Sequence, residues 1–310
     1  ITMAIPDYQT LMLPFLKLLA AGEEPTLQDL NEKLSAEFQL TEAERHELLP
    51  SGNQGIMRNR VGWVRTYLKK ALLLEAPRRA VFTITDRGQG VLAEKPEFIN
   101  ARYLKRFEEF CEFQNSTPGT AKATTQVTAQ TVDIEEVQTP TEAIEAAFNT
   151  LNNDLASDVL DAIKSQTPQF FEHLVVKLMQ AMGYGGWSKD SGQATQYTSD
   201  GGIDGIINED PLGLETIYLQ AKRYTDNAIG RPDIQAFVGA LEMRRARKGV
   251  FITTSRFSKD ALEYISMIEK KVVLIDGKQL ADLMIKHNLG VTVKETFQIK
   301  TIDTDYFIED

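Results

Sequence analysis

Hydrophobic residues recur every three to four positions in the first quarter of the chain, and this period predicts helices. The helical stretches cover residues 8–21, 27–34, 41–49 and 59–72. Thr26 stands three positions before Asp29, and Thr41 three positions before Glu44. This spacing is typical of a capping box, in which the two side chains satisfy the free N–H groups at a helix start.

Residues 59–72 combine an apolar stripe with a basic face, which is typical of a DNA-recognition helix. Two short β-prone stretches follow and predict a hairpin with arginines at its tip. Helix, helix, basic helix and hairpin is the order of a winged helix-turn-helix, so we expect residues 1–113 to form an α+β DNA-binding domain of this type. A small α+β domain whose arginines only form a solvated face is the alternative.

The composition changes abruptly after residue 113. Residues 114–131 are rich in Thr, Ala and Gln and poor in bulky apolar side chains, so they cannot bury enough surface to offset ordering. We expect residues 114–155 to be a linker that contains one helix, at residues 141–151. This helix either tethers or dimerises the second half, and the linker leaves open whether the first domain guides or blocks the second.

The remaining residues, 156–310, show helical and strand patterns in alternation. Helices are expected at 159–166, 167–182, 258–270 and 277–288, a polar loop at 188–198, a strand hairpin within 199–222, and strands at 249–254 and 272–275. A hairpin followed by strands that helices connect predicts a mixed sheet flanked by helices.

Length and composition limit the possibilities further. With 310 residues and 42% hydrophobic content, the chain is long enough for two domains, each with its own core. One cysteine and three scattered histidines exclude a disulfide framework and a thiolate zinc site, so any metal is expected to have oxygen ligands. Neither a membrane span nor a secretory signal is indicated, and we expect a cytoplasmic protein.

The charge is unevenly distributed. The chain carries a net −10, whereas residues 55–87 carry a net +6, which indicates a localised phosphate-binding surface. The residues expected to contact DNA are Arg58, Arg60, Arg65, Lys69, Lys70, Arg78 and Arg79.

The hairpin within residues 199–222 holds the residues with the clearest chemistry. Asp204 is expected to bind a divalent ion and Gln220 to add an amide oxygen. Lys222 lies two positions after Gln220 and so on the same face of its strand, where it would orient the attacking water. A Gly-Gly-x-Asp-Gly stretch alone is more often a tight turn, and it is the combination with Gln-x-Lys that favours a phosphodiesterase site.

Several motifs together resemble the Mrr family of restriction endonucleases. They are Phe171-Glu172, Met182-Gly-Tyr-Gly185, Asp200-Gly-Gly-Ile-Asp-Gly205, Leu212-Gly-Leu214, Ile217-Tyr-Leu-Gln-Ala-Lys-Arg223, Gly230-Arg-Pro-Asp-Ile-Gln235 and Gly249-Val-Phe-Ile-Thr-Thr-Ser255. The pattern from Asp204 to Lys222 also resembles the PD-(D/E)XK nuclease core, in the variant with glutamine at the middle position.

The resemblance implies a type IV, modification-dependent restriction enzyme that cleaves methylated double-stranded DNA with Mg²⁺, or with Mn²⁺ as a substitute. It implies that Asp204, Gln220 and Lys222 are catalytic, that Glu172 completes the metal site, and that Gln235 is an accessory residue. Neutral Gln220 replaces the commoner acid and leaves the number of metals open. One site per chain also implies a homo-oligomer, at least on DNA.

Two other functions remain open at this point. A winged-helix regulator with a non-catalytic second domain is disfavoured because all three catalytic residue types are present. A junction-resolving or repair nuclease on the same core is the nearer alternative, since the core does not encode the structure of its substrate.

Overall fold

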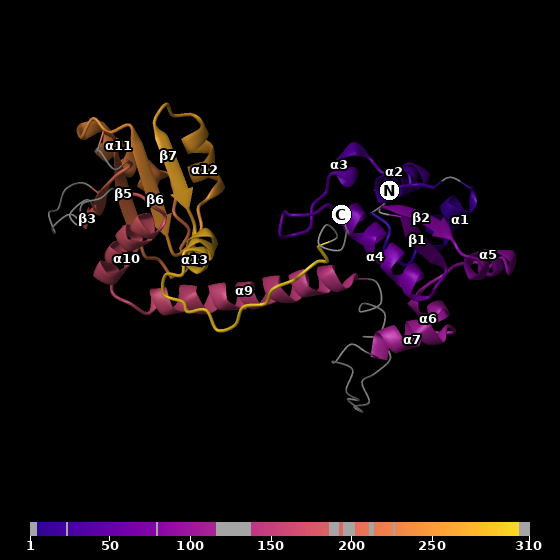
Figure 1. The fold of residues 1–310 in the computed structure, drawn as a ribbon. Helices are drawn as coiled ribbons and strands as arrows, with labels where there is room; N and C mark the ends of the chain where they lie inside the picture. The colour runs from indigo at the N-terminus through magenta and orange to yellow at the C-terminus, as the bar shows by residue number, and fades with distance from the viewer. Residues whose placement is uncertain are drawn as a thin grey trace. The chain divides into compact units, whose positions relative to one another are not determined.

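The computed structural model describes residues 5–22, 24–78, 80–115, 138–185, 192–194, 202–210, 214–225 and 227–303. The chain divides into two compact units, residues 1–149 and 150–310 (Figure 1). Helix α9, Pro140–Lys164, begins in the first unit and ends in the second. The limits expected from the sequence for the linker and the nuclease domain stay a prediction.

The first unit has the predicted order of helices and a hairpin. Its elements are α1 (Met12–Ala20), α2 (Leu27–Glu37), α3 (Glu42–Arg45), α4 (Ile56–Lys70), β1 (Leu74–Arg78), β2 (Val81–Ile84), α5 (Asp86–Ala93), α6 (Ala101–Leu104) and α7 (Glu108–Asn115). Strands β1 and β2 pair antiparallel, with an irregularity between Glu75 and Arg78. Both capping boxes are confirmed: Thr26 accepts from the Asp29 N–H and Thr41 from the Glu44 N–H, and both acids bond back.

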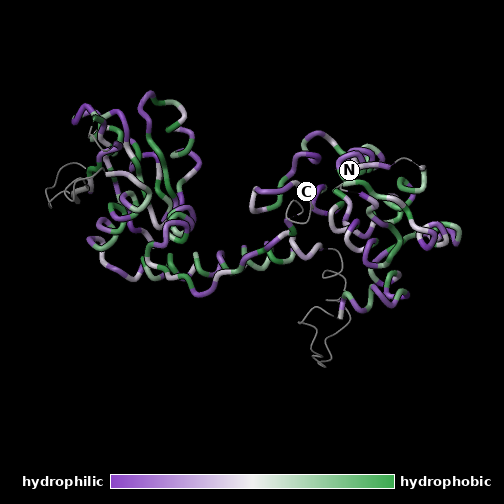
Figure 2. Tube along the Cα trace, viewed as in Figure 1, coloured by the Kyte–Doolittle hydropathy of each residue, from purple (hydrophilic) through white to green (hydrophobic). Residues whose placement is uncertain are grey.

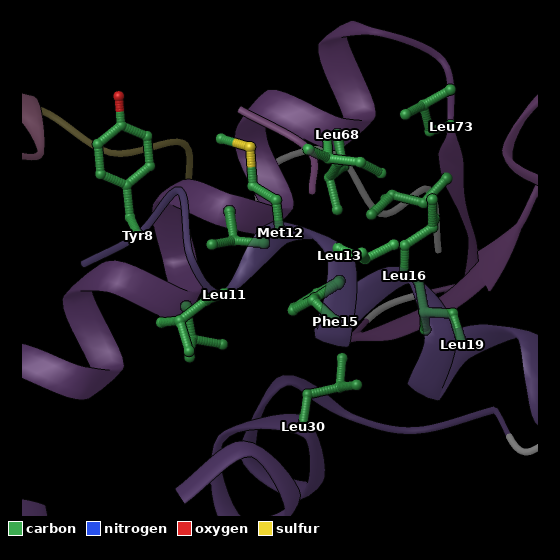
Figure 3. Packing of buried hydrophobic residues seen from close by; sticks show 14 of the residues in the cluster. Tyr8, Leu11, Met12, Leu13, Phe15, Leu16, Leu19, Leu30, Leu68 and Leu73 are labelled. Atoms are coloured by element: carbon green, nitrogen blue, oxygen red, sulfur yellow. The ribbon is translucent and has the colours of Figure 1, made fainter. Parts of the chain in front are cut away.

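Buried side chains from α1, α2 and α4 form the core of the first unit. Figure 3 shows Leu11, Phe15 and Leu16 of this core close to Leu30 and Leu68. Because the apolar face of α4 is buried here, its orientation is set by packing, and its other faces are left for polar contacts.

Several predicted helix boundaries were wrong. The helix expected at 41–49 is the single turn α3, which ends at Arg45. The helix expected at 102–113 is two short helices, α6 and α7, separated by residues 105–107. The helices expected at 141–151 and 159–166 are the single helix α9. No Gly or Pro lies between residues 141 and 164, so nothing in the local chain forces the break that the prediction placed there.

The second unit contains a five-stranded mixed sheet. Its elements are α10 (Pro168–Ala181), β3 (Gly192–Ala194), β4 (Gly205–Asn208), β5 (Thr216–Lys222), α11 (Arg231–Met243), β6 (Lys248–Thr253), α12 (Lys259–Ser266), β7 (Lys271–Ile275) and α13 (Gly277–Lys286). The strand order is β3-β4-β5-β6-β7, with antiparallel pairing as far as β5 and parallel pairing from β5 to β7. The mixed sheet is therefore confirmed, but part of the loop expected at 188–198 is the edge strand β3.

Helices cover both faces of this sheet. Val250 and Ile252 of β6 pack with α10, α13 and the end of α9, whereas Phe251 between them packs with α11 and α12. This alternation follows from the two-residue period of a strand. Figure 2 shows hydrophobic segments concentrated along these strands. None of the helices in the described part of the chain is long and apolar enough to cross a membrane.

Candidate functional site

Strands β4 and β5 bring the three central residues of the predicted site together. Asp204 immediately precedes β4, and its N–H donates to the Leu219 carbonyl at 2.8 Å. Gln220 and Lys222 lie within the last three residues of β5. They are two positions apart and therefore on the same face of the strand. The antiparallel pairing of β4 with β5, in which Gly205 lies opposite Leu219, sets Asp204 beside Gln220.

The Asp204 carboxylate is held in a fixed position. Its Oδ2 accepts hydrogen bonds from the Ala221 N–H at 2.7 Å and from the Gln220 side-chain amide at 2.9 Å. Burial raises the pKa of Asp204 above its usual value, and these two hydrogen bonds and nearby Lys222 oppose the rise only in part. The carboxylate is therefore oriented, while its negative charge is not fully compensated.

Glu172 of α10 brings a second carboxylate close to the first. Burial, followed by the negative charge of Asp204, raises the pKa of Glu172. A carboxylate whose pKa is raised by burial and by a neighbouring negative charge is kept ionised more easily when a divalent ion is bound beside it.

These donors fit a hard divalent ion. Glu172 and Asp204 supply carboxylate oxygens and Gln220 supplies an amide oxygen, which are ligands that Mg²⁺ accepts. A side chain at Gly202 would approach the Gln220 Oε1 to 2.8 Å, so glycine keeps this oxygen accessible, and its φ of +94° also favours glycine. Among the described residues, no group of three or more His, Cys, Asp or Glu side chains could hold a metal ion. The ion would thus depend on Gln220 and the substrate for further ligands.

The raised pKa of Glu172 predicts a stability gain when its charge is removed. A carboxyl with a raised folded-state pKa holds its proton more tightly when folded, so its ionisation at neutral pH destabilises the fold. We expect Glu172→Gln to raise the free energy of unfolding at pH 7, without divalent ions, by up to about 1 kcal/mol. The gain should vanish near pH 3.5, roughly below the pKa of a free Glu, where Glu172 is protonated in both states.

Urea unfolding at the two pH values measures this effect. The exposed Glu269 of the same unit, changed to Gln, is the control for loss of one negative charge. An equal increase in the free energy of unfolding in both variants, or an increase in the Glu172→Gln variant that persists at pH 3.5, would contradict the proximity of Glu172 to Asp204.

Lys222 forms an ion pair that the sequence prediction missed. Its Nζ lies 2.5 Å from Oδ1 of Asp233, which is the third residue of α11, and both side chains are partly buried. Burial lowers the pKa of Lys222, but the hydrogen bond and charge of Asp233 outweigh it, so the net shift is upward. Lys222 is therefore a cation at neutral pH, suited to donating hydrogen bonds and unsuited to accepting a proton.

Thr253, the last residue of β6, and Thr254, which follows it, fix the backbone around Lys222. The Thr253 hydroxyl donates to the Lys222 carbonyl at 2.8 Å, and the Thr254 hydroxyl donates to the Tyr224 carbonyl at 2.7 Å. Both threonines are buried. Their position beside Lys222 follows from the parallel register of β5 and β6, which sequence spacing does not reveal.

Gln235 occupies a different part of α11 from Asp233. Two residues along a helix correspond to a rotation of about 200°, so the two side chains point to nearly opposite sides. Asp233 is directed to Lys222, whereas the Gln235 side chain is exposed. In the described structure Asp233, and not Gln235, is the α11 residue that contacts the predicted site.

The predicted DNA-contacting residues of α4 fall on separate faces. Arg58, Arg65 and Lys69 are seven and four positions apart, so they lie in one stripe along the helix, which runs beside its buried apolar face. Arg58 and Lys69 are exposed, and the guanidinium of Arg65 lies over the Phe82 ring at 5.8 Å. We call these three residues the basic stripe.

Arg60 has a structural use instead. Its guanidinium donates to the Glu142 carboxylate at 2.8 Å and to the carbonyls of Ile5 and Pro6. Asn59 and Trp63 of α4 likewise bond Thr139 and Thr141 at the start of α9. Because its Nε and Nη1 are engaged in these bonds, Arg60 is less available for a phosphate than its neighbours on α4, and its contact with DNA stays a prediction.

The other basic residues have mixed surroundings. Arg78 pairs with Glu24 at an exposed position, and the Lys70 Nζ lies 5.1 Å from the centre of the Phe113 ring. Arg79 lies outside the described residues. These positions leave the basic stripe as the set with the most regular geometry for contacting a row of phosphates.

Comparison with known proteins identifies both units. Residues 163–284 match the family described as "Restriction endonuclease", and residues 8–94 match the "Mrr N-terminal domain". The chain is 34% identical over 310 residues to "Type IV methyl-directed restriction enzyme EcoKMrr" of Escherichia coli (strain K12), covering 98% of this chain and 100% of that protein.

Solved structures give weaker likenesses. "MspJI Restriction Endonuclease in Complex with 27-mer Oligonucleotide" is 21% identical with a TM-score of 0.31, covering 68% of this chain and 49% of that one. "DNA modification-dependent restriction endonuclease AspBHI" is 19% identical with a TM-score of 0.36, covering 71% and 56%. The chain thus spans about half the length of these two proteins.

The family match and the architecture confirm the predicted fold class, a PD-(D/E)XK-like nuclease unit with a mixed sheet, preceded by a winged helix-turn-helix. Asp204, Gln220 and Lys222 all lie within the matched nuclease region. The identity extends over nearly the whole length of both chains. The chain therefore belongs to the Mrr family of restriction endonucleases.

Proposed function

We propose that this DNA endonuclease cleaves double-stranded DNA that carries methylated bases, by metal-assisted attack of water on a phosphodiester. The observation that carries the proposal is the cluster of Asp204, Gln220 and Lys222 at adjacent strand ends, with Glu172 close to Asp204. The methyl-directed activity printed in the name of the Escherichia coli relative supports the choice of substrate.

Each residue then has a defined task. Glu172, Asp204 and Gln220 would hold Mg²⁺, or Mn²⁺ in its place. A bound divalent ion lowers the pKa of water and neutralises developing charge on the phosphate. Lys222, kept protonated by Asp233, donates hydrogen bonds to the attacking water or to a phosphate oxygen, where negative charge grows in the transition state.

The first unit would select the site on DNA. In this proposal α4 approaches the major groove and the basic stripe contacts phosphates, which gives affinity and register without reading the bases. Gly62 lies on the same side of α4, and a Cβ there would meet nothing within 4 Å, so this side is open to an approaching backbone. The described residues of one chain hold one such cluster, so cleavage of both strands at the same time would take two chains.

Matched plasmids test this proposal. Wild-type protein is incubated with methylated and unmethylated copies of one plasmid, each with Mg²⁺ or with EDTA. We expect cleavage only of the methylated plasmid and only with Mg²⁺. Equal cleavage of both plasmids would favour a junction-resolving or repair nuclease, and cleavage in EDTA would contradict the metal site.

A further inference from the structure

Gly62 lies within the basic stripe on the outer side of α4. It stands four positions after Arg58 and three before Arg65, so it belongs to the same row of the helix. A Cβ at Gly62 would meet nothing within 4 Å among the described residues. The row of cations therefore has an open place in its middle.

Neither the backbone nor packing within the described chain requires a glycine at this position. Gly62 is not among the glycines with positive φ, so alanine would fit the helix equally well. The open space around its Cβ excludes a close contact that only glycine allows. Glycine inside a helix is less stable than alanine, because it loses more conformational freedom on folding. Gly62 is therefore explained by a ligand that approaches α4 closely at this point.

Thr66 borders the open place at Gly62. It follows one helical turn later, and its hydroxyl donates to the Gly62 carbonyl at 3.0 Å. Because the hydroxyl is engaged inside the helix, the group that the partly exposed Thr66 offers to a ligand is its methyl. Threonine methyl groups make apolar contacts with the methyl group of a base in the major groove.

We propose that Gly62 and Thr66 accommodate the methyl group of a modified base, so that this part of α4 distinguishes methylated from unmethylated DNA. The inference rests on the proposed function, in which α4 approaches the major groove. The methyl groups of 5-methylcytosine and of N6-methyladenine both project into that groove, on the base edges that proteins read there. Either methyl adds one carbon that needs space, and Gly62 leaves this space free.

The dimensions of the groove favour a base over a phosphate at Gly62. Arg58 and Lys69 are eleven residues apart, which is ~16 Å along the helix, whereas the major groove is about 12 Å wide. A helix that crosses the groove therefore brings the two ends of the basic stripe to the two rows of phosphates. Gly62, which lies between these ends, faces the floor of the groove, where the base edges are exposed.

The Gly62→Ala variant tests the inference, because its effects on folding and on binding have opposite signs. Alanine is the better helix former and should raise the unfolding temperature of the full chain by about 2–4 °C. Its methyl group takes the space that the methyl group of the base would occupy. We expect the affinity for methylated DNA to fall by about tenfold or more, while the affinity for unmethylated DNA changes by less than about twofold.

Binding is measured on a fragment of the plasmid that wild type cleaves, in EDTA, so that the DNA is not cut. The fragment is prepared unmethylated, with 5-methylcytosine and with N6-methyladenine. The base whose methyl group is recognised is the one for which Gly62→Ala loses affinity. Thr66→Ser keeps the hydroxyl that bonds to Gly62 and removes only the methyl. We expect it to bind the same methylated fragment about fourfold more weakly, the effect of leaving one methyl group in water.

Gly90→Ala is the matched control. Gly90 lies in α5 of the same unit, lacks a positive φ, and has no described atom within 4 Å of a Cβ at its position. Like Gly62→Ala, this variant should gain thermal stability. Because Gly90 lies outside α4, it should keep the wild-type preference for methylated DNA.

Two results would overturn the inference. If Gly62→Ala loses affinity equally for methylated and unmethylated DNA, Gly62 lies against the sugar–phosphate backbone. If Gly62→Ala or Thr66→Ser binds every fragment as wild type does, that residue takes no part in recognising a methyl group. The proposed function fails separately, since that failure requires wild type to cleave methylated and unmethylated plasmids alike. Selective cleavage by both wild type and Gly62→Ala would leave the function intact and place methyl recognition elsewhere in the chain.

Discussion

Replacing Lys222 with alanine is expected to lower the rate of DNA cleavage by about 10³-fold, the size of effect found when a transition-state hydrogen-bond donor is removed. The pair with Asp233 keeps Lys222 charged and fixes its position beside Asp204. The loss should therefore appear in the rate of bond cleavage and not in DNA affinity. Single-turnover cleavage of methylated DNA and a binding titration measure the two quantities separately.

Two further variants strengthen this test. Lys259→Ala removes an exposed lysine of α12 and should cleave at the wild-type rate. Asp233→Asn keeps the lysine but removes its anion, and we expect a smaller loss of rate than in Lys222→Ala. Full activity in a folded Lys222→Ala protein would remove Lys222 from the catalytic cluster.

Neutralising the basic stripe is expected to weaken DNA binding by roughly ten- to a hundredfold near physiological salt, because three phosphate contacts are lost. The changes are Arg58→Gln, Arg65→Gln and Lys69→Gln together. The slope of log affinity against log salt should become shallower by about 2.7, which is roughly 0.9 for each phosphate contact. Binding titrations at several salt concentrations give both numbers.

A second triple variant distinguishes the loss of the basic stripe from the loss of three positive charges elsewhere in the unit. Lys95, Arg102 and Lys105 are exposed in the same unit but lie outside α4. Changing these three to Gln alters the charge equally, and we expect nearly the wild-type salt slope. If the control loses as much DNA affinity as the α4 variant, or if the α4 variant keeps the wild-type salt slope, α4 is not the main DNA-contacting element.

Local patterns predicted much of this fold. The apolar period of α4, the capping boxes of α2 and α3, and the strand alternation around Gln220 all depend on neighbours within a few residues. Such short-range preferences can be interpreted directly from sequence. For the same reason the central cluster was accessible, since Gln220 and Lys222 share one strand face through spacing alone.

Features that depend on tertiary contacts were missed. Arg60 looks like its basic neighbours in sequence, and only the start of α9, through Glu142, gives it another partner. Asp233 stands 11 positions after Lys222, and the fold of the intervening residues decides that they meet. The edge strand β3 likewise depends on pairing with β4 and not on its own Gly-Gln-Ala sequence.

The central claim, that Glu172 and Asp204 form a divalent-metal site, is tested most directly by thermal unfolding with and without Mg²⁺. A ligand that binds only the folded state raises the unfolding temperature. We predict that Mg²⁺ stabilises wild type and the Glu269→Gln control but not Glu172→Gln or Asp204→Asn. Equal stabilisation of all four proteins by Mg²⁺ would contradict the account.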